Sequence, residues 1–143
     1  MRLNVPRTAR RRGFGLIDGL IALVILSFGL LGMSRLQARM VAQATETQSR
    51  ATAMQFAEEL LSLALVDVAN AACYTLPQAG VCNSVVAQGQ ANDWHDRATA
   101  TLPGSPTAEA ALGVDGRMTV TLTWTGRESQ DTHSLVAVSD VRP

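Results

Sequence analysis

The sequence has 143 residues, of which 47% are apolar and 17% are charged, and its formal net charge at pH 7 is zero. A chain of this length forms one domain at most. Five arginines and no acid precede Phe14, whereas the rest of the chain has seven arginines, twelve acids and no lysine, a net charge of −5. The body therefore lacks the basic face that phosphate recognition needs, and we expect no nucleic acid partner.

The arginines of residues 1–13 stand directly before an apolar segment, residues 14–34, which carries a single charge. As a helix this segment would span about 32 Å, enough to cross the hydrocarbon core of a bilayer. The excess of arginine on its N-terminal side predicts that the N-terminus faces the cytoplasm and that everything after Arg35 lies outside. An arm for binding nucleic acid is the alternative interpretation of the arginines.

The helix is expected to continue beyond the apolar segment. Neither Gly nor Pro occurs between Met33 and Leu76, and the composition favours helix, so one helix from about Phe14 to about Asn70 is predicted, with residues 35–70 outside the membrane. A stripe at helical spacing is predicted to pack against the chain's own headgroup, with Arg39, Glu46, Arg50 and Glu58 facing elsewhere. The stripe consists of Leu36, Met40, Thr47, Ala51, Met54, Leu61 and Leu65.

Two cysteines, Cys73 and Cys82, follow this helix. If this part of the chain is exported, a disulfide between them is plausible, and a loop this short would contribute about 2 to 3 kcal/mol in the chain-entropy model. Spacing alone leaves a pair of buried free thiols open as the alternative.

Residues 71–143 read as a small α+β headgroup, rich in turn residues after Pro77. A short helix is predicted from Asp93 to Leu102, begun by Asn92, although Thr99 and Thr101 are poor helix formers. Residues 117–125 alternate apolar and Thr side chains and predict a strand, and residues 134–141 predict a second, joined by a hairpin loop over 126–133. The expected fold is one long N-terminal helix packed against a small sheet of two or three antiparallel strands.

No enzyme signature is present in the sequence. His95 and His133 are the only histidines, the acids show no catalytic grouping, and the motifs for serine hydrolases, zinc proteases, redox dithiols and phosphate-binding loops do not occur. Asp93, His95 and Asp96 form the one conceivable metal cluster, but their spacing is better explained by a solvated loop or helix start. We expect no catalytic residue, cofactor or metal.

The run Arg11-Arg12-Gly13-Phe14-Gly15-Leu16-Ile17-Asp18 resembles the class III signal of type IV prepilins, a basic leader that ends in Gly, followed by Phe and by an acid at the fifth mature position. The resemblance implies that residues 1–13 are removed by a prepilin peptidase between Gly13 and Phe14, that the amine of Phe14 is N-methylated, and that Asp18 acts in assembly. An ordinary secretory signal is cut after its apolar stretch and loses it. Here the mature protein would keep the stretch.

An isolated carboxylate in lipid is costly, so Asp18 needs a partner. In the prepilin family this acid attracts the N-terminal amine of a neighbouring subunit, which sets the register of each pilin entering the filament. The alternative is that Asp18 only complements the positive end of its own helix, which is worth about 1 kcal/mol at most in exposed settings. The sequence departs from the usual pattern in three places, with Asp18 for Glu, Gly15 for Thr, and Arg35 where major pilins have Pro.

Residues 29–37, 93–104 and 120–124 together look like the PilV-like minor pilins, also called type IV pilus modification proteins. This implies a type IV pilin-like fold and a single-pass protein of the bacterial inner membrane, with its headgroup in the periplasm, that primes pilus assembly for adhesion or twitching motility. Its partners would be prepilin peptidase, other minor pilins, the major pilin and inner-membrane lipid. The alternatives are a type II secretion pseudopilin, and an unrelated single-pass anchor with a periplasmic binding head, which would not be cut at Gly13.

Overall fold

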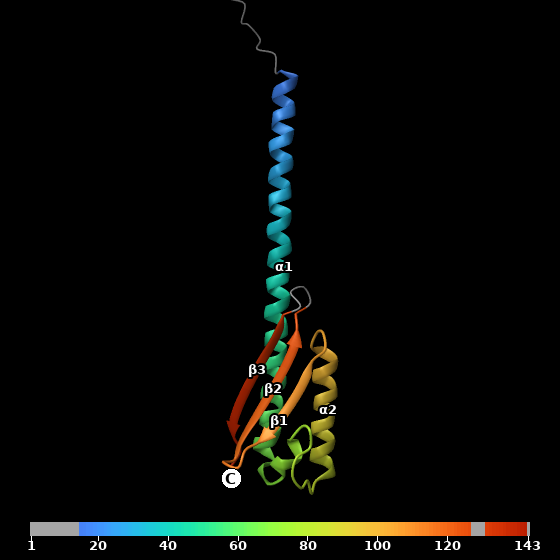
Figure 1. Cartoon of the computed structure of the whole chain (residues 1–143), viewed down its shortest axis with the longest axis vertical. Helices are drawn as coiled ribbons and strands as arrows, with labels where there is room; N and C mark the ends of the chain where they lie inside the picture. Colours follow the sequence, from blue (N-terminus) through green and yellow to red (C-terminus); the bar gives the residue numbers. More distant parts are fainter. Residues whose placement is uncertain (1–14, 127–130, 143) are drawn as a thin grey trace, which may run out of the picture. The chain divides into compact units, whose positions relative to one another are not determined.

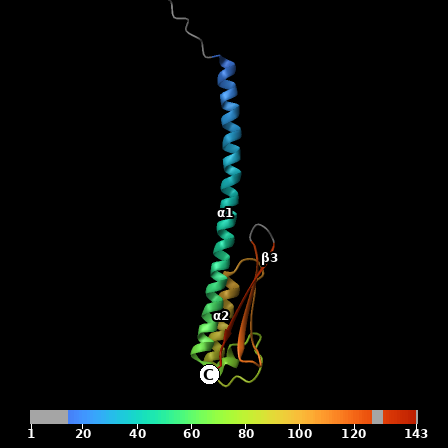
Figure 2. The same cartoon turned by 90° about the vertical axis from the view of Figure 1, so that its left-hand side faces the viewer.

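The computed structural model describes residues 15–126 and 131–142. Figures 1 and 2 show its elements, which in chain order are helix α1 (Leu16–Val66), the 3-10 helix η1 (Val68–Tyr74), helix α2 (Val85–Thr101) and the strands β1 (Thr107–Leu112), β2 (Arg117–Thr125) and β3 (Thr132–Asp140). The chain divides into two compact units, Met1–Met40 and Val41–Pro143. The first unit holds the apolar part of α1, and the second holds the rest of α1 and every other element.

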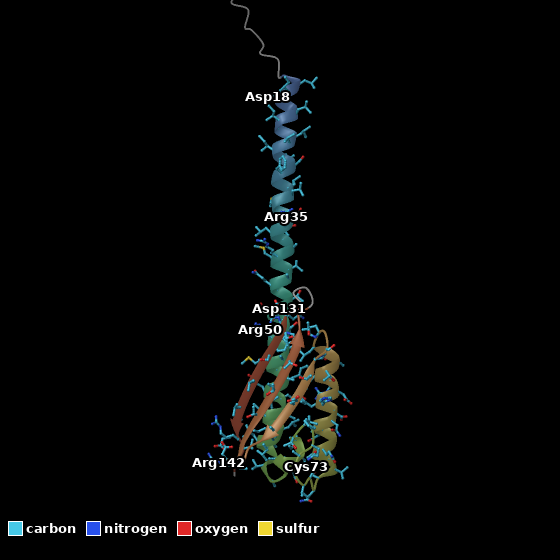
Figure 3. The ribbon with its side chains drawn as sticks, viewed as in Figure 1. Asp18, Arg35, Arg50, Cys73, Asp131 and Arg142 are labelled. Atoms are coloured by element: carbon cyan, nitrogen blue, oxygen red, sulfur yellow. A yellow bond between two sulfur atoms is a disulfide. The ribbon has the colours of Figure 1, made fainter. Side chains whose placement is uncertain are left out.

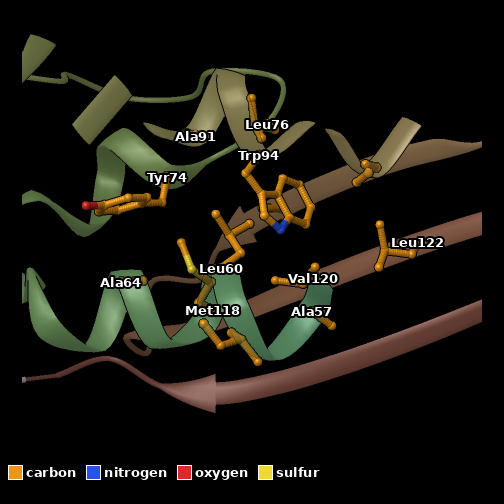
Figure 4. Packing of buried hydrophobic residues seen from close by; sticks show 14 of the residues in the cluster. Ala57, Leu60, Ala64, Tyr74, Leu76, Ala91, Trp94, Met118, Val120 and Leu122 are labelled. Atoms are coloured by element: carbon orange, nitrogen blue, oxygen red, sulfur yellow. The ribbon is translucent and has the colours of Figure 1, made fainter. Parts of the chain in front are cut away.

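The second unit has a single apolar core, part of which is shown in Figure 4. Helix α1 contributes Ala53, Ala57, Leu60, Leu61 and Ala64, and α2 contributes Ala87, Ala91, Trp94 and Ala98. The sheet contributes Ala108, Ala110, Met118, Val120, Leu122 and Trp124. The predicted α+β layout, a long apolar N-terminal helix and a small antiparallel sheet, is confirmed.

The predicted stripe on α1 is wrong in all but one position. Met54 and Leu65 are 56% and 45% exposed, and of the predicted stripe only Leu61 is buried. The buried face of α1 is instead rich in alanine. Small side chains let the backbone of α1 approach the side chains of α2. The indole N–H of Trp94 on α2 donates to the backbone carbonyl of Phe56 on α1 at 2.8 Å. The prediction gave weight to large apolar side chains and overlooked the alanines.

Helix α1 ends at Val66 and not near Asn70 as predicted. Asn70 donates through Nδ2 to Oδ1 of Asp67, three residues earlier, at 2.8 Å. Short polar side chains that bond locally compete with helix continuation. The chain therefore leaves α1 through η1, although no Gly or Pro interrupts the sequence there.

Cys73 and Cys82 form a disulfide with an S–S distance of 2.09 Å, which confirms the predicted bridge and rules out the free thiols. Cys73 belongs to η1 and Cys82 to the loop before α2. The bond therefore closes the loop that joins the end of the α1 region to α2.

Replacing both cysteines, Cys73→Ser with Cys82→Ser, should lower the free energy of unfolding by about 2 to 3 kcal/mol, because the unfolded chain regains the freedom of a short loop. Urea unfolding of the detergent-solubilised protein, followed by tryptophan fluorescence, measures the loss. Reduction of the unmodified protein with dithiothreitol serves as the control and should give a similar loss. A loss below about 0.5 kcal/mol in both would contradict the prediction.

The predicted short helix at residues 93–102 is the second half of a longer one. Helix α2 begins at Val85, where the hydroxyl of Ser84 caps the helix by accepting the N–H of Ala87 at 3.2 Å. Two adjacent valines conceal this start, since β-branched residues are modest helix formers. Thr99 and Thr101 fit within the helix because their hydroxyls donate to the carbonyls of His95 and Arg97.

The sheet has the strand order β1-β2-β3 with both pairs antiparallel. The bounds predicted for β2 are correct, and its alternate residues from Met118 to Trp124 are buried. Strand β3 starts at Thr132 and ends at Asp140, slightly earlier than predicted. The sequence alone gives no residue range for β1, because Thr-Ala-Glu-Ala-Ala-Leu contains good helix formers. Pairing with β2 overrides that preference and buries Ala108 and Ala110.

Candidate functional site: the apolar segment and its acid

The first unit presents a continuous apolar surface. Leu16 is 85% exposed and Phe28 is 72% exposed, and the large apolar side chains between and after them are also open to the surroundings. Among the described residues α1 is the one helix long and apolar enough to cross a membrane, and its apolar window has no buried residue. Residues 16–34 span about 28 Å, close to the thickness of a hydrocarbon core. Soluble monomers rarely expose so much apolar area, so this segment requires lipid or protein around it.

Asp18 is the acid of this segment and lies in the first turn of α1, as Figure 3 shows. Its side chain is exposed, and its backbone N–H donates to the carbonyl of Gly15 at 2.9 Å. No hydrogen bond or ion pair joins its carboxylate to any residue within 15–126 or 131–142. The next charge along the chain is Arg35, on the far side of the apolar segment.

The position of Asp18 has two opposing electrostatic consequences. Near the start of a helix a carboxylate is favoured by about 0.3 to 1 kcal/mol, because it faces the unbonded N–H groups. An acid at the centre of a membrane helix costs about 2.5 to 3.5 kcal/mol on insertion scales, and less near an interface. Where the cost of placing Asp18 in lipid exceeds this benefit, an external cation would compensate the difference.

The two residues of the predicted processing site, Gly13 and Phe14, lie outside the described residues. The description begins at Gly15, one residue before α1. The predicted cleavage between Gly13 and Phe14, and the methylation of Phe14, stay predictions.

The histidines of the second unit have acidic neighbours. Asp93, His95 and Asp96 lie on α2, and Nδ1 of His95 is 3.5 Å from Oδ1 of Asp96. His133 stacks on Trp124 with ring centroids 5.7 Å apart, and its Nε2 is 3.3 Å from Oε2 of Glu46. Within the described part of the chain no three His, Cys, Asp or Glu side chains are placed to hold a metal ion.

Scans against protein-family models, curated proteins and solved structures found no match to this chain.

The contacts that hold α1 to α2 were not predicted from the sequence. The guanidinium of Arg97 donates to the two carboxylate oxygens of Glu59 at 2.5 and 3.2 Å, and this side-chain hydrogen bonding raises the pKa of Arg97. The same guanidinium lies 5.9 Å from the ring centre of Phe56, whose carbonyl accepts from Trp94. Trp94 and Arg97 are one helical turn apart in the sequence, which indicates that they share one face of a helix. Their partners, Phe56 and Glu59, lie 38 residues earlier and cannot be identified from spacing. These contacts fix the C-terminal part of α1 within the second unit.

Proposed function

We propose that this chain is a minor pilin, similar to the PilV-like proteins, that takes part in priming and assembling a type IV pilus. The observation that carries the proposal is an exposed, membrane-length apolar segment whose one acid, Asp18, lies four residues after Phe14 and lacks a described partner. The basic leader that ends in Gly13 precedes it. This combination matches what a subunit needs if it waits in a membrane and then enters a helical bundle.

The proposed sequence of events starts with insertion. The arginines of residues 1–13 keep the N-terminus in the cytoplasm while α1 crosses the inner membrane and the second unit reaches the periplasm. The Cys73–Cys82 disulfide supports this placement, because disulfides persist in the periplasm and are rare in the cytosol. Prepilin peptidase then cuts between Gly13 and Phe14, and the amine of Phe14 becomes available.

Assembly follows from charge and apolar burial. The carboxylate of Asp18 attracts the N-terminal amine of a neighbouring subunit, and the attraction is strong because lipid and packed helices screen charges poorly. The exposed apolar side chains of the first unit then exchange lipid for the helices of other minor pilins and of the major pilin. Asp18 thereby sets the register at which the subunit joins.

Deletion of the gene in its host should reduce the number of surface pili, counted by electron microscopy, and the unmodified gene should restore them. A Gly13→Leu variant should accumulate uncleaved in the membrane and fail to restore them, because a bulky side chain at the cut obstructs the peptidase. Loss of protein secretion with normal piliation would replace this proposal with the pseudopilin function. Normal piliation and normal secretion after deletion would contradict both.

A further inference from the structure

Strand β3 forms one edge of the sheet, and Figure 1 shows it as the outermost strand. It pairs with β2 along one side, and β2 is the one element of the described chain whose backbone lies close to it. The opposite edge of the sheet is closed, because Leu76 forms an antiparallel bridge with Ala110 of β1. The open side of the sheet is therefore β3.

The register of the sheet shows which backbone groups of β3 face outward. Leu76 and Ala110 each donate an N–H to the carbonyl of the other at 2.8 Å, so Ala110 directs both of its groups away from β2. Alternate residues of an antiparallel strand direct these groups to opposite sides. Val120, which is opposite Ala110, therefore directs its groups toward β3, where its partner is Ala137.

The same alternation leaves Ser134, Val136 and Val138 with their N–H and carbonyl groups directed away from β2. The N–H of Val141 donates to the carbonyl of Gly116 at 2.9 Å, as expected for the alternate set that faces β2. No group within residues 15–126 or 131–142 hydrogen-bonds to the three outward pairs. Donors and acceptors at every second residue match the main chain of another extended strand.

The side chains beside this edge are apolar and exposed on both faces of the sheet. On the outer face Val136 is 59% exposed and Val138 is 45% exposed. On the inner face Leu135 and Ala137 are only partly buried at the margin of the core, whereas Val120 of β2 is fully buried. A strand added here would extend the core past β3.

The edge lacks the features that usually protect an exposed strand. Natural edge strands are short, or carry Lys, Pro or a bulge. Strand β3 has nine residues, pairs with β2 without a bulge, and has no Pro, Gly, Lys, Arg, Asp or Glu in residues 132–139. The one titratable side chain in that range, His133, stacks on Trp124. An uncharged strand fits this edge best, because a charged side chain beside the valines would lose hydration and gain no opposite charge.

We propose that the free edge of β3 binds an extended, uncharged segment of another protein, which adds a fourth strand to the sheet. The main chain of the segment bonds to Ser134, Val136 and Val138, and its apolar side chains cover the two valines on the outer face. The main-chain bonds supply affinity, and the absence of charge supplies selectivity. This binding site goes beyond the pilin function and does not depend on it.

The probe is the uncharged peptide acetyl-Thr-Val-Thr-Val-Thr-amide. It is added to the full-length ¹⁵N-labelled protein in detergent micelles at up to about 5 mM, since a short flexible peptide loses much conformational freedom on binding. We expect saturable shifts of the backbone amides of Ser134, Val136 and Val138, together with slower exchange of their amide protons. The exchange of Leu135 and Ala137, whose amides already face β2, should change much less.

Modified peptides separate strand pairing from apolar contact. The same peptide N-methylated at two adjacent central residues cannot pair fully from either side of its strand, and it should bind about fivefold more weakly or worse. Replacing both peptide valines by Glu, or both by Lys, should weaken binding by about threefold or more. Shifts that do not saturate, or that are equal for the methylated peptide, would overturn strand pairing. Equal binding by the charged peptides would overturn the selectivity.

A matched pair of proline variants tests the edge itself. Val136→Pro removes an outward N–H at a position where an edge strand tolerates Pro, and it should weaken binding by about fivefold or more. Val85→Pro makes the same change at the first residue of α2, which is 85% exposed and suits Pro, so binding should be unchanged. Equal weakening by both variants would contradict the assigned site. The methylated peptide tests the pairing even if Val136→Pro does not fold.

A second copy of this chain is the competing occupant of the edge. Sedimentation of the protein in detergent without peptide should give a monomer, with fast exchange of the Val136 amide. A dimer in which this amide is protected, and which the peptide dissociates, would assign the edge to a second copy and overturn the proposal. These assays need neither cleavage at Gly13 nor a host, so their failure is distinguishable from failure of the pilin proposal.

Discussion

Replacing Asp18 by Ala should leave membrane insertion intact and strongly impair incorporation of the protein into the pilus assembly. Insertion depends on the apolar segment and on the leader arginines, which the substitution does not alter. In the proposed function, incorporation depends on the pairing of the Asp18 carboxylate with the amine of a neighbour, and Ala provides no charge. Fractionation of host membranes measures the first property, and co-purification with other minor pilins, together with a count of surface pili, measures the second.

Two further variants separate charge from side-chain size in the Asp18 experiment. Asp18→Asn keeps the shape and removes the charge, so it should behave as Asp18→Ala does. Asp18→Glu keeps the charge and adds one methylene, so it should restore incorporation. The control is Glu58→Ala, which removes an exposed acid from the part of α1 in the second unit and should have no effect. Normal piliation and normal co-purification by both uncharged Asp18 variants would contradict the account.

Replacing Trp94 by Ala should destabilise the second unit by about 3 to 5 kcal/mol. Trp94 is fully buried, and its indole N–H is the donor to the Phe56 carbonyl, so the substitution opens a large cavity and leaves a carbonyl unpaired. Figure 4 shows Trp94 in the cluster with Leu60 and Val120, which come from α1 and β2. Urea unfolding of the solubilised protein, followed by near-ultraviolet circular dichroism, measures the change.

A matched pair isolates the hydrogen bond of Trp94. Trp94→Phe removes the donor and keeps an aromatic ring, whereas Trp124→Phe removes an equally buried indole whose Nε1 has no partner among the described residues. Both variants lose similar volume, so Trp94→Phe should cost about 1 kcal/mol more than Trp124→Phe. An equal cost, or a larger cost for Trp124→Phe, would contradict the assigned role of the Phe56 contact.

The features that the sequence predicts correctly are those encoded by local patterns. The apolar segment, strand β2 and the start of a long helix follow from runs of residues that need no partner to be recognised. Asp18 is conspicuous for the same reason, since it is one charge in an otherwise apolar run. The disulfide was predicted from two cysteines with one alternative left open, and the structure decided between them.

The features that the sequence does not reveal depend on contacts between distant residues. The buried face of α1 is made largely of alanine because α2 lies close, and α2 itself was only half predicted. Strand β1 contains helix-forming residues and becomes a strand through pairing with β2 and Leu76.

The most direct test of the account is the mass of the intact protein and of its N-terminal peptide, isolated from membranes of its host. We predict a chain that begins at N-methylated Phe14 and still contains the whole apolar segment. A chain that begins at Met1 while prepilin peptidase is active, or that begins after residue 36, would contradict the account.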